Sequence, residues 1–164
     1  MNTNQPNSPA SADLIIKHVW IVTMDEERRI FRDGAIAVKG DRITGVGPSP
    51  DILQNFRADT VIDGTDKFVI TPGLVNGHVH VTGEPITRGL VPDNTDWQEN
   101  VFGWLIPTYL SQTPQDEQLS AKLAALEMLR TGTTCFVEAS TILDLDATVQ
   151  ALNETGIRGR LGQW

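Results

Sequence analysis

Two histidines separated by one residue, His78 and His80, are the side chains in this sequence best suited by type and spacing to chemistry. They follow an apolar run, and in a β-strand the side chains at positions i and i+2 point to the same face. Neutral imidazole is a favoured ligand for Zn²⁺ and for ions such as Fe²⁺ and Ni²⁺. A pair of metal ligands is therefore one interpretation of the pattern, for which the spacing alone is weak evidence. Two ordinary loop histidines, or two hydrogen-bonded core histidines, would give the same spacing.

The elements that would position this pair alternate between strands and helices. Apolar and β-branched runs predict strands at residues 68–76, 133–137 and 157–161. One helix is predicted to begin after Thr113, its N-cap, and to end before Gly132. Its leucines recur at helical spacing: Leu119, Leu123, Leu126 and Leu129. A second helix carries Leu145, Val149 and Leu152 on one face and ends at Gly156. Such alternation predicts a parallel sheet with right-handed crossovers.

Two architectures fit a parallel sheet of this kind, a doubly wound open sheet and a (β/α)8 barrel. A full barrel takes about 250 residues, so residues 71–164 have room for about three of its eight units. The histidine pair lies at the C-terminal end of the first strand, where barrel active sites are built. The doubly wound alternative, with a structural histidine pair, lacks a glycine-rich phosphate turn, because Thr71-Pro72-Gly73 does not match G-x-G-x-x-G.

The chain before residue 70 has a different pattern, in which short β-type runs alternate with turn residues. Gly40-Asp41 separates two such runs, which is typical of a hairpin. We predict a small antiparallel β unit over residues 13–70 that closes into a sandwich or partial barrel. Residues 1–12 are polar and lack the basic and apolar regions of a secretory signal, which predicts a disordered leader. His18, within the β unit, is expected to be an exposed strand or turn residue.

Residues 71–80, TPGLVNGHVH, resemble the Pro-Gly-Leu-Ile-(Asn/Asp)-x-His-x-His signature of the amidohydrolase superfamily. Residues 13–25 are similar to that family's N-terminal segment. Arg88-Gly89, Trp97 and residues 129–134 resemble the branch that holds deaminases of adenosine-type nucleosides, guanine deaminase and triazine hydrolases. The resemblance covers nearly the whole chain from Asp13 onward.

This resemblance implies a (β/α)8 TIM barrel preceded by a composite β domain, in an enzyme that forms a homo-oligomer. It implies that His78 and His80 ligate one divalent metal ion, Zn²⁺ or Fe²⁺. Water activated by that metal would hydrolyse a non-peptide C–N bond, deaminating a purine, pyrimidine or triazine-like heterocycle. Dehalogenation is the neighbouring reaction. A small heterocyclic molecule is therefore the expected partner.

The resemblance also implies later metal-binding histidines, a catalytic acid/base and an aspartate after the eighth strand. The sequence has three histidines, and the third, His18, precedes the barrel region. A catalytic zinc site typically has three protein ligands. We therefore expect this chain to be the N-terminal part of the enzyme, inactive and poorly soluble alone. The alternative is a non-catalytic metal-binding or pseudo-enzyme module.

Three further residues are candidates for the site. Trp97 lies in the long segment between the first strand and the first long helix, residues 81–112. It would either join an aromatic mini-core or form part of the wall of a pocket for a flat heterocycle. Arg88 would meet a substrate anion or form a surface ion pair, and one residue more separates it from the histidines than in relatives. Glu138, at the end of the second strand, would hydrogen-bond a metal-bound histidine, cap a helix or be solvated.

Composition limits the remaining partners. The formal net charge of −8 argues against nucleic acid and anionic membranes, which reward clustered Lys and Arg. No apolar run approaches the roughly 20 residues of a membrane helix. Cys135 is the single cysteine, so no internal disulfide is possible and a cytoplasmic location is expected. Cys135 itself is expected to be an inert core residue.

Overall fold

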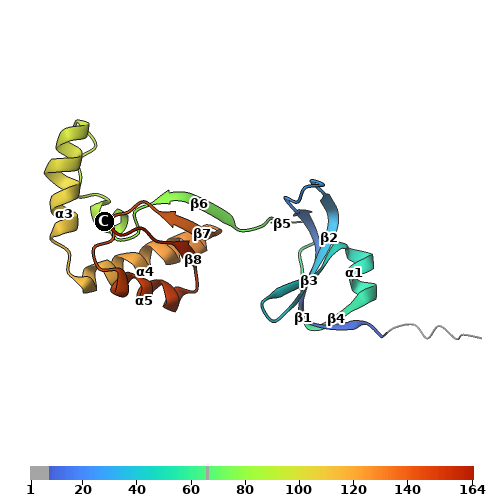
Figure 1. The fold of residues 1–164 in the computed structure, drawn as a ribbon. Coiled ribbons are helices and arrows are strands. Elements are labelled where there is room, and N and C mark those ends of the chain that lie inside the picture. Colours follow the sequence, from blue (N-terminus) through green and yellow to red (C-terminus); the bar gives the residue numbers. More distant parts are fainter. Residues whose placement is uncertain (1–7, 66) are drawn as a thin grey trace, which may run out of the picture. The chain divides into compact units, whose positions relative to one another are not determined.

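The structure, a computed structural model, describes residues 8–65 and 67–164. The chain forms two compact units, and the boundary falls between Pro72 and Gly73. The first unit contains a five-stranded sheet and the second a three-stranded sheet (Figure 1). None of the helices within the described ranges is long and apolar enough to cross a membrane.

The first unit is a sheet with strand order β3-β2-β1-β4, and β5 also pairs with β1. A single short helix, α1 (Ser49–Asn55), connects β3 to β4. The strands are β1 (Ala10–Val22), β2 (Ile30–Lys39), β3 (Arg42–Pro48), β4 (Phe56–Asp63) and β5 (Val69–Ile70).

The prediction of a purely antiparallel unit is wrong, because β1 pairs with β4 and with β5 in parallel. Pro48 is the N-cap of α1, and Ser49 and Pro50 begin its first turn, where a proline is tolerated. That helix supplies the crossover that parallel neighbours need.

The predicted disordered leader is too long. Ala10, Ser11 and Ala12 belong to β1 and pair with the start of β4. Backbone hydrogen bonding in a sheet does not depend on apolar side chains, so a polar composition did not exclude a strand here. The first part of the predicted leader, residues 1–7, lies outside the described residues.

Two small apolar clusters form the core of the first unit. One gathers Ala12, Ile15, Ala35, Ala37 and Ile52, and the other gathers Val19, Ile21 and Ile36. Other apolar side chains of β3, β4 and β5 are exposed: Ile43, Val46, Val61, Ile62 and Val69. Within this unit the sheet therefore keeps apolar surface that its own residues leave uncovered.

The second unit is a parallel sheet in the order β6-β7-β8, with two long helices running side by side along it (Figure 1). The strands are β6 (Leu74–Val79), β7 (Thr133–Glu138) and β8 (Arg158–Arg160). The helices are α2 (Glu84–Thr87), η1 (Glu99–Leu105), α3 (Ile106–Leu110), α4 (Pro114–Arg130) and α5 (Leu145–Thr155). The predicted strand–helix alternation with parallel pairing is confirmed.

The ends of the long helices follow the sequence signals. The Thr113 side chain accepts a hydrogen bond from the Asp116 backbone N–H, and the Asp116 side chain accepts one from the Thr113 backbone N–H. The two bonds form a capping box. Gly156 ends α5 with a φ of 74°, a left-handed conformation that glycine adopts without strain.

The leucine series that predicted α4 is not the face that this helix buries. Leu119, Leu123, Leu126 and Leu129 are exposed, whereas Ala121, Ala124, Ala125 and Met128 join the core of the unit. Small side chains on this face let the helix approach Phe136 of β7 and Ala151 of α5, which belong to the same apolar cluster. The helical period was therefore predicted correctly, and the buried face differs from the leucine face.

Candidate metal centre

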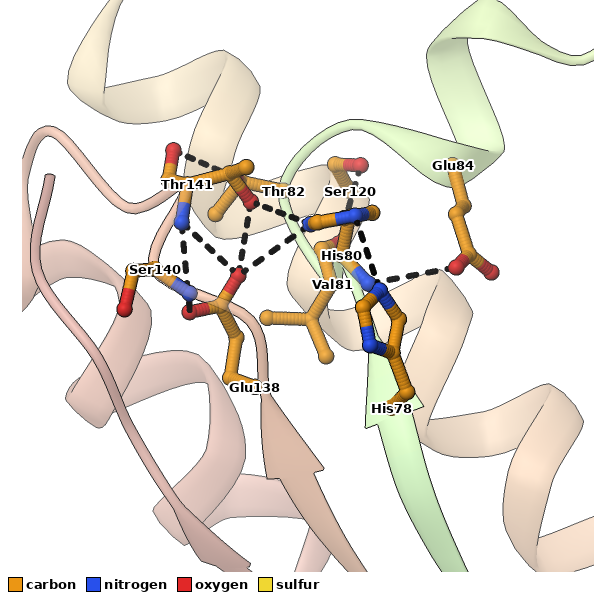
Figure 2. A network of polar contacts seen from close by, with 9 residues as sticks. All are labelled: His78, His80, Val81, Thr82, Glu84, Ser120, Glu138, Ser140 and Thr141. Atoms are coloured by element: carbon orange, nitrogen blue, oxygen red, sulfur yellow. Dashed lines mark hydrogen bonds and ion pairs between the residues drawn. The ribbon is translucent and has the colours of Figure 1, made fainter.

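The histidine pair and Glu138 meet at one edge of the parallel sheet. His78 lies near the end of β6, His80 directly follows that strand, and Glu138 ends β7. Because Val79 pairs with Glu138 across the two parallel strands, their C-terminal ends lie together. Figure 2 shows both imidazoles and the Glu138 carboxylate gathered at this edge.

The two imidazole rings converge, as their i, i+2 spacing predicts. The two Nε2 atoms lie 3.4 Å apart, and the ring centroids are 5.1 Å apart with the ring planes perpendicular. His78 is exposed, and His80 is half-buried. The two Nε2 atoms are therefore close to one another, on residues that are not fully buried.

This separation fits two ligands of a single metal ion. Two nitrogen ligands of one tetrahedral Zn²⁺, each at about 2.1 Å from the ion, lie about 3.4 Å apart. Neutral imidazole is also the donor type that such an ion prefers. The part of the chain that the structure describes contains no group of three or more His, Cys, Asp or Glu side chains suited to hold a metal. The described residues thus supply a pair of ligands rather than a full set.

Glu138 lies behind His80 and is enclosed in hydrogen bonds. Its side chain is 0% exposed. It accepts hydrogen bonds from the backbone N–H groups of Ser140 (2.6 Å) and Thr141 (3.1 Å), and from the Thr141 hydroxyl (2.6 Å). Its Oε1 lies 4.0 Å from His80 Nδ1, too far for a direct hydrogen bond.

Thr141 fills the gap between Glu138 and His80. Its Oγ1 lies 3.3 Å from His80 Nδ1, so the hydroxyl links the buried carboxylate to the ring (Figure 2). Sequence reasoning missed this residue, because Thr141 follows the strand end in a loop and has no periodic relation to the histidines. The available signal was its position three residues after Glu138, a spacing at which a turn can bring a side chain back.

The backbone of His80 is also fixed. Its N–H donates to Glu84 Oε1 at 3.1 Å, from the start of α2. The Tyr109 ring packs close to Gly83, next to this carboxylate. Burial raises the pKa of the Tyr109 hydroxyl, and the charges of Glu84 and Glu138 raise it further. Acidic groups therefore surround the histidine pair on two sides, an environment suited to a cation.

Arg88 and Trp97 are engaged elsewhere. Both Glu127 carboxylate oxygens lie 2.9 Å from Arg88 Nη1, an exposed ion pair with α4 that matches the surface-pair interpretation. Trp97 is 69% exposed and packs edge-to-face on Phe102, with ring centroids 5.9 Å apart. An aromatic mini-core around Trp97 and Phe102 is not formed, because both side chains are exposed, and of the aromatic residues at positions 81–112 only Tyr109 is buried.

Comparison with known proteins decides the family. Residues 69–163 match the model of the amidohydrolase family. The chain belongs to that family. Its matched region includes the histidine pair, Glu138 and Thr141, so the candidate metal centre lies within the part that relates this amidohydrolase chain to its family.

Curated relatives of this amidohydrolase are deaminases. The chain is 38% identical over 157 residues to 5-methylthioadenosine/S-adenosylhomocysteine deaminase of Nitratidesulfovibrio vulgaris, covering 94% of this chain and 34% of that protein. It is 34% identical to 5'-deoxyadenosine deaminase of Methanosarcina barkeri, covering 92% and 33% respectively. The chain thus spans about a third of the length of the curated relatives it matches.

Two solved structures share the fold of this chain. An adenosine deaminase from Xanthomonas campestris with bound zinc matches with a TM-score of 0.83 and 27% identity, over 93% of this chain and 34% of that one. Atrazine chlorohydrolase from Arthrobacter aurescens, complexed with zinc, matches with a TM-score of 0.64 and 24% identity, over 89% and 34%. The second match shows a shared fold alone.

Proposed function

We propose that this chain supplies His78 and His80 as two metal ligands of an enzyme that deaminates an adenosine-type compound. The observation that carries the proposal is the 3.4 Å separation of the two Nε2 atoms at the strand ends. Membership of the amidohydrolase family supports the metal, and relatives named as deaminases of 5-methylthioadenosine and 5'-deoxyadenosine support the substrate class. Zinc is favoured, because the Xanthomonas adenosine deaminase carries it.

The proposal includes the architecture around the site. We take β6, β7 and β8 as three strands of a (β/α)8 barrel, in which active sites lie at the C-terminal strand ends. The histidine pair and Glu138 occupy that edge. A catalytic zinc site typically has three protein ligands, so further ligands would come from outside the described residues.

Together with further ligands, His78 and His80 would hold a divalent ion that activates water for addition at the carbon that carries the amino group, and the amino group would leave as ammonia. The residues of this chain would hold the metal ion and orient the side chains that bind it. His78 and His80 present their Nε2 atoms, and Glu84 fixes the backbone of His80 through its N–H. Glu138, through Thr141, supports the His80 ring from behind. Trp97 is proposed to contact the flat substrate ring, whereas Arg88 is proposed to have a structural role in its pair with Glu127.

Metal binding tests the ligand pair. The 164-residue chain is titrated with Zn²⁺ and Co²⁺ by calorimetry, alongside a His78→Ala/His80→Ala variant. His18→Asn is the matched control, because His18 lies in the first unit and asparagine tolerates its positive φ of 54°. We expect one ion per chain in the wild type and in His18→Asn, and at least a tenfold loss of affinity in the double variant. Equal affinity in all three proteins would remove the ligand pair from the proposal.

Activity separates the enzyme from the alternative, a non-catalytic metal-binding module. The protein is purified in the form that its own gene produces, loaded with Zn²⁺, and assayed for ammonia release from 5'-deoxyadenosine, 5-methylthioadenosine and a triazine. We expect release from the adenosine-type compounds and none above background in His78→Ala. Metal binding without ammonia release from any of these compounds would favour the non-catalytic module.

A further inference from the structure

We infer that Thr141 is a positioning residue that sets the tautomer of His80, so that Nε2 offers its lone pair to the metal before any metal arrives. The inference rests on the proposed function in one respect, the assignment of His80 as a ligand. It adds a residue and a physical reason that neither the family resemblance nor the motif supplies.

The positions of the hydrogens between Glu138, Thr141 and His80 follow from which atoms can donate and which can accept. A threonine hydroxyl has one hydrogen to donate and two lone pairs with which to accept. The Thr141 hydroxyl lies 2.6 Å from Glu138 Oε1, and a carboxylate can only accept, so the single hydrogen points to Glu138. Oγ1 therefore presents a lone pair to His80 Nδ1 at 3.3 Å. Nδ1 must then carry the hydrogen, which leaves Nε2 unprotonated and able to ligate.

The orientation of Glu138 is itself fixed. Its carboxylate is buried and receives the backbone N–H groups of Ser140 and Thr141, so it cannot rotate without leaving these donors unsatisfied. Glu138 is too far from His80 Nδ1 to act directly. The hydroxyl of Thr141 is therefore the link through which the carboxylate reaches the ring. Figure 2 draws this link beside the longer 4.0 Å contact between Glu138 and His80.

A strained turn places Thr141. Ser140 has a φ of 64°, a left-handed conformation that non-glycine residues seldom adopt and that persists only where the surroundings impose it. The surroundings here do so: Ala139 N–H donates to Val79 O at 2.9 Å, and the Thr82 hydroxyl donates to Thr141 O at 3.3 Å. A Cβ on Gly162 would lie 2.4 Å from Ser140 Oγ, so the absence of a side chain there leaves room for the turn.

His78 lacks a support of this kind. Among the described residues, no side chain or backbone group hydrogen-bonds His78 Nδ1. The 3.4 Å contact between the two Nε2 atoms needs one donor and one acceptor. With His80 Nε2 unprotonated, His78 Nε2–H is the donor in the metal-free chain. The two histidines thus differ: His80 is preset for ligation, and His78 must release its Nε2 hydrogen when metal binds.

The test reads the tautomer directly in metal-free protein. The 164-residue chain, labelled with ¹⁵N-histidine, is examined by long-range ¹H–¹⁵N NMR at a pH of about 8.5, where an ordinary imidazole is neutral. The signals of the three histidines are assigned with His80→Gln and His18→Asn. We expect His80 to show a protonated Nδ1 and His78 a protonated Nε2. In Thr141→Val the His80 pattern should shift toward the Nε2–H form, and in Thr141→Ser it should stay as in the wild type.

Metal affinity provides the second readout. Thr141→Val should bind Zn²⁺ about ten- to a hundredfold more weakly than the wild type, as is typical when a residue that orients a metal-bound histidine is removed. Thr134→Val is the matched control, because it makes the same change in β7, where Thr134 neighbours Gly73 and Arg158 instead of the histidine pair. Its affinity and its His80 signals should be those of the wild type.

The outcomes separate the inference from the proposed function. A wild-type His80 with a protonated Nε2, or a Thr141→Val protein with unchanged tautomer and affinity, would overturn the inference. The wild-type spectrum decides this even if Thr141→Val does not fold. The expected tautomers in a chain that binds no Zn²⁺ would uphold the role of Thr141 and overturn the metal assignment instead.

Discussion

The two units of the chain use acidic side chains in different ways. In the first unit, Asp13, Asp25 and Asp63 lie on the surface and pair with Lys39, Arg29 and Lys17. The second unit has exposed pairs as well, such as Arg88 with Glu127, but it also contains two buried carboxylates, Glu138 and Glu117. Glu138 accepts the Ser140 N–H, and Glu117 accepts the Asp144 N–H at 3.0 Å. Exposed pairs contribute little to stability because water screens them. A buried carboxylate instead determines where its neighbours lie.

Because of this difference, we regard the first unit as a structural scaffold and the second unit as the one that contains the candidate site. The first unit is held together by strand pairing and small apolar clusters. Its ion pairs join neighbouring strands, as in Lys17–Asp63, or lie within a loop, as in Asp25–Arg29. The second unit contains a strand edge where buried charge organises the backbone around the histidine pair. Substitutions of polar residues should therefore have small effects in the first unit and larger, more local effects in the second.

The largest effect is expected from the core of the second unit. Phe136 is 0% exposed and is the largest fully buried side chain among the described residues. Its ring also packs against Gly159, where a Cβ would lie 2.5 Å away. Phe136→Ala should reduce the free energy of unfolding of this unit by about 3–5 kcal/mol. Its neighbour Val137 is 42% exposed, and Val137→Ala should cost about 1 kcal/mol or less.

Hydrogen exchange measured by NMR, combined with urea denaturation, checks this prediction unit by unit. Amides of β6, β7 and α4 should lose protection in Phe136→Ala, while those of β1 and β2 should keep theirs. Equal loss of protection in β1 and β2 would mean that the two units unfold as one cooperative block, and the contrast between scaffold and site would not hold.

An intermediate effect is expected at the start of α4. Thr113 and Asp116 form a capping box, whereas α1 in the first unit begins at Pro48 without a side-chain cap. Thr113→Ala should reduce the unfolding free energy of the second unit by about 1 kcal/mol, because a backbone N–H loses its acceptor. Thr113→Ser keeps the hydroxyl and should stay close to the wild type in the same urea denaturation. A similar loss in both variants would assign the effect to the threonine methyl group instead.

Local signals predicted much of the second unit. Thr113 and Pro114 marked the start of α4, Gly156 marked the end of α5, and the i, i+2 spacing placed both imidazoles on one side of β6. These features depend on residues close in sequence, whose conformational preferences act without tertiary context. The end of β7 at Glu138 was predicted for the same reason.

The features that were missed depend on tertiary structure. The parallel pairing of β1 with β4 requires the crossover helix α1, and its Pro-Ser-Pro start is equally compatible with a loop. The buried face of α4 consists largely of alanines because Phe136 and Ala151 pack close to it, which leucine spacing cannot reveal. Thr141 reaches His80 because Ser140 is held in a left-handed conformation, and no sequence pattern predicts that conformation.

The smallest effect is expected from Asp25, in the exposed loop between β1 and β2. Hydrogen bonding by the backbone N–H of Arg29, and then by its side chain, lowers the pKa of Asp25 from its ordinary 3.8 to about 2. Since the folded pKa is depressed, the contribution of Asp25 to stability is fully present at pH values above its ordinary pKa and is lost as pH falls from about 4 through about 2.

A ¹³C NMR titration of the Asp25 carboxyl group should give a midpoint near 2. In Arg29→Met the midpoint should rise but stay below 3.8, because the backbone donor, the largest cause, remains. Asp25→Asn should leave the urea midpoint at pH 7 almost unchanged, because Asp25 is only half-buried and water screens its pair with Arg29. A loss of stability in Asp25→Asn comparable to that of Phe136→Ala would show that the ion pairs of the first unit contribute substantially to its stability.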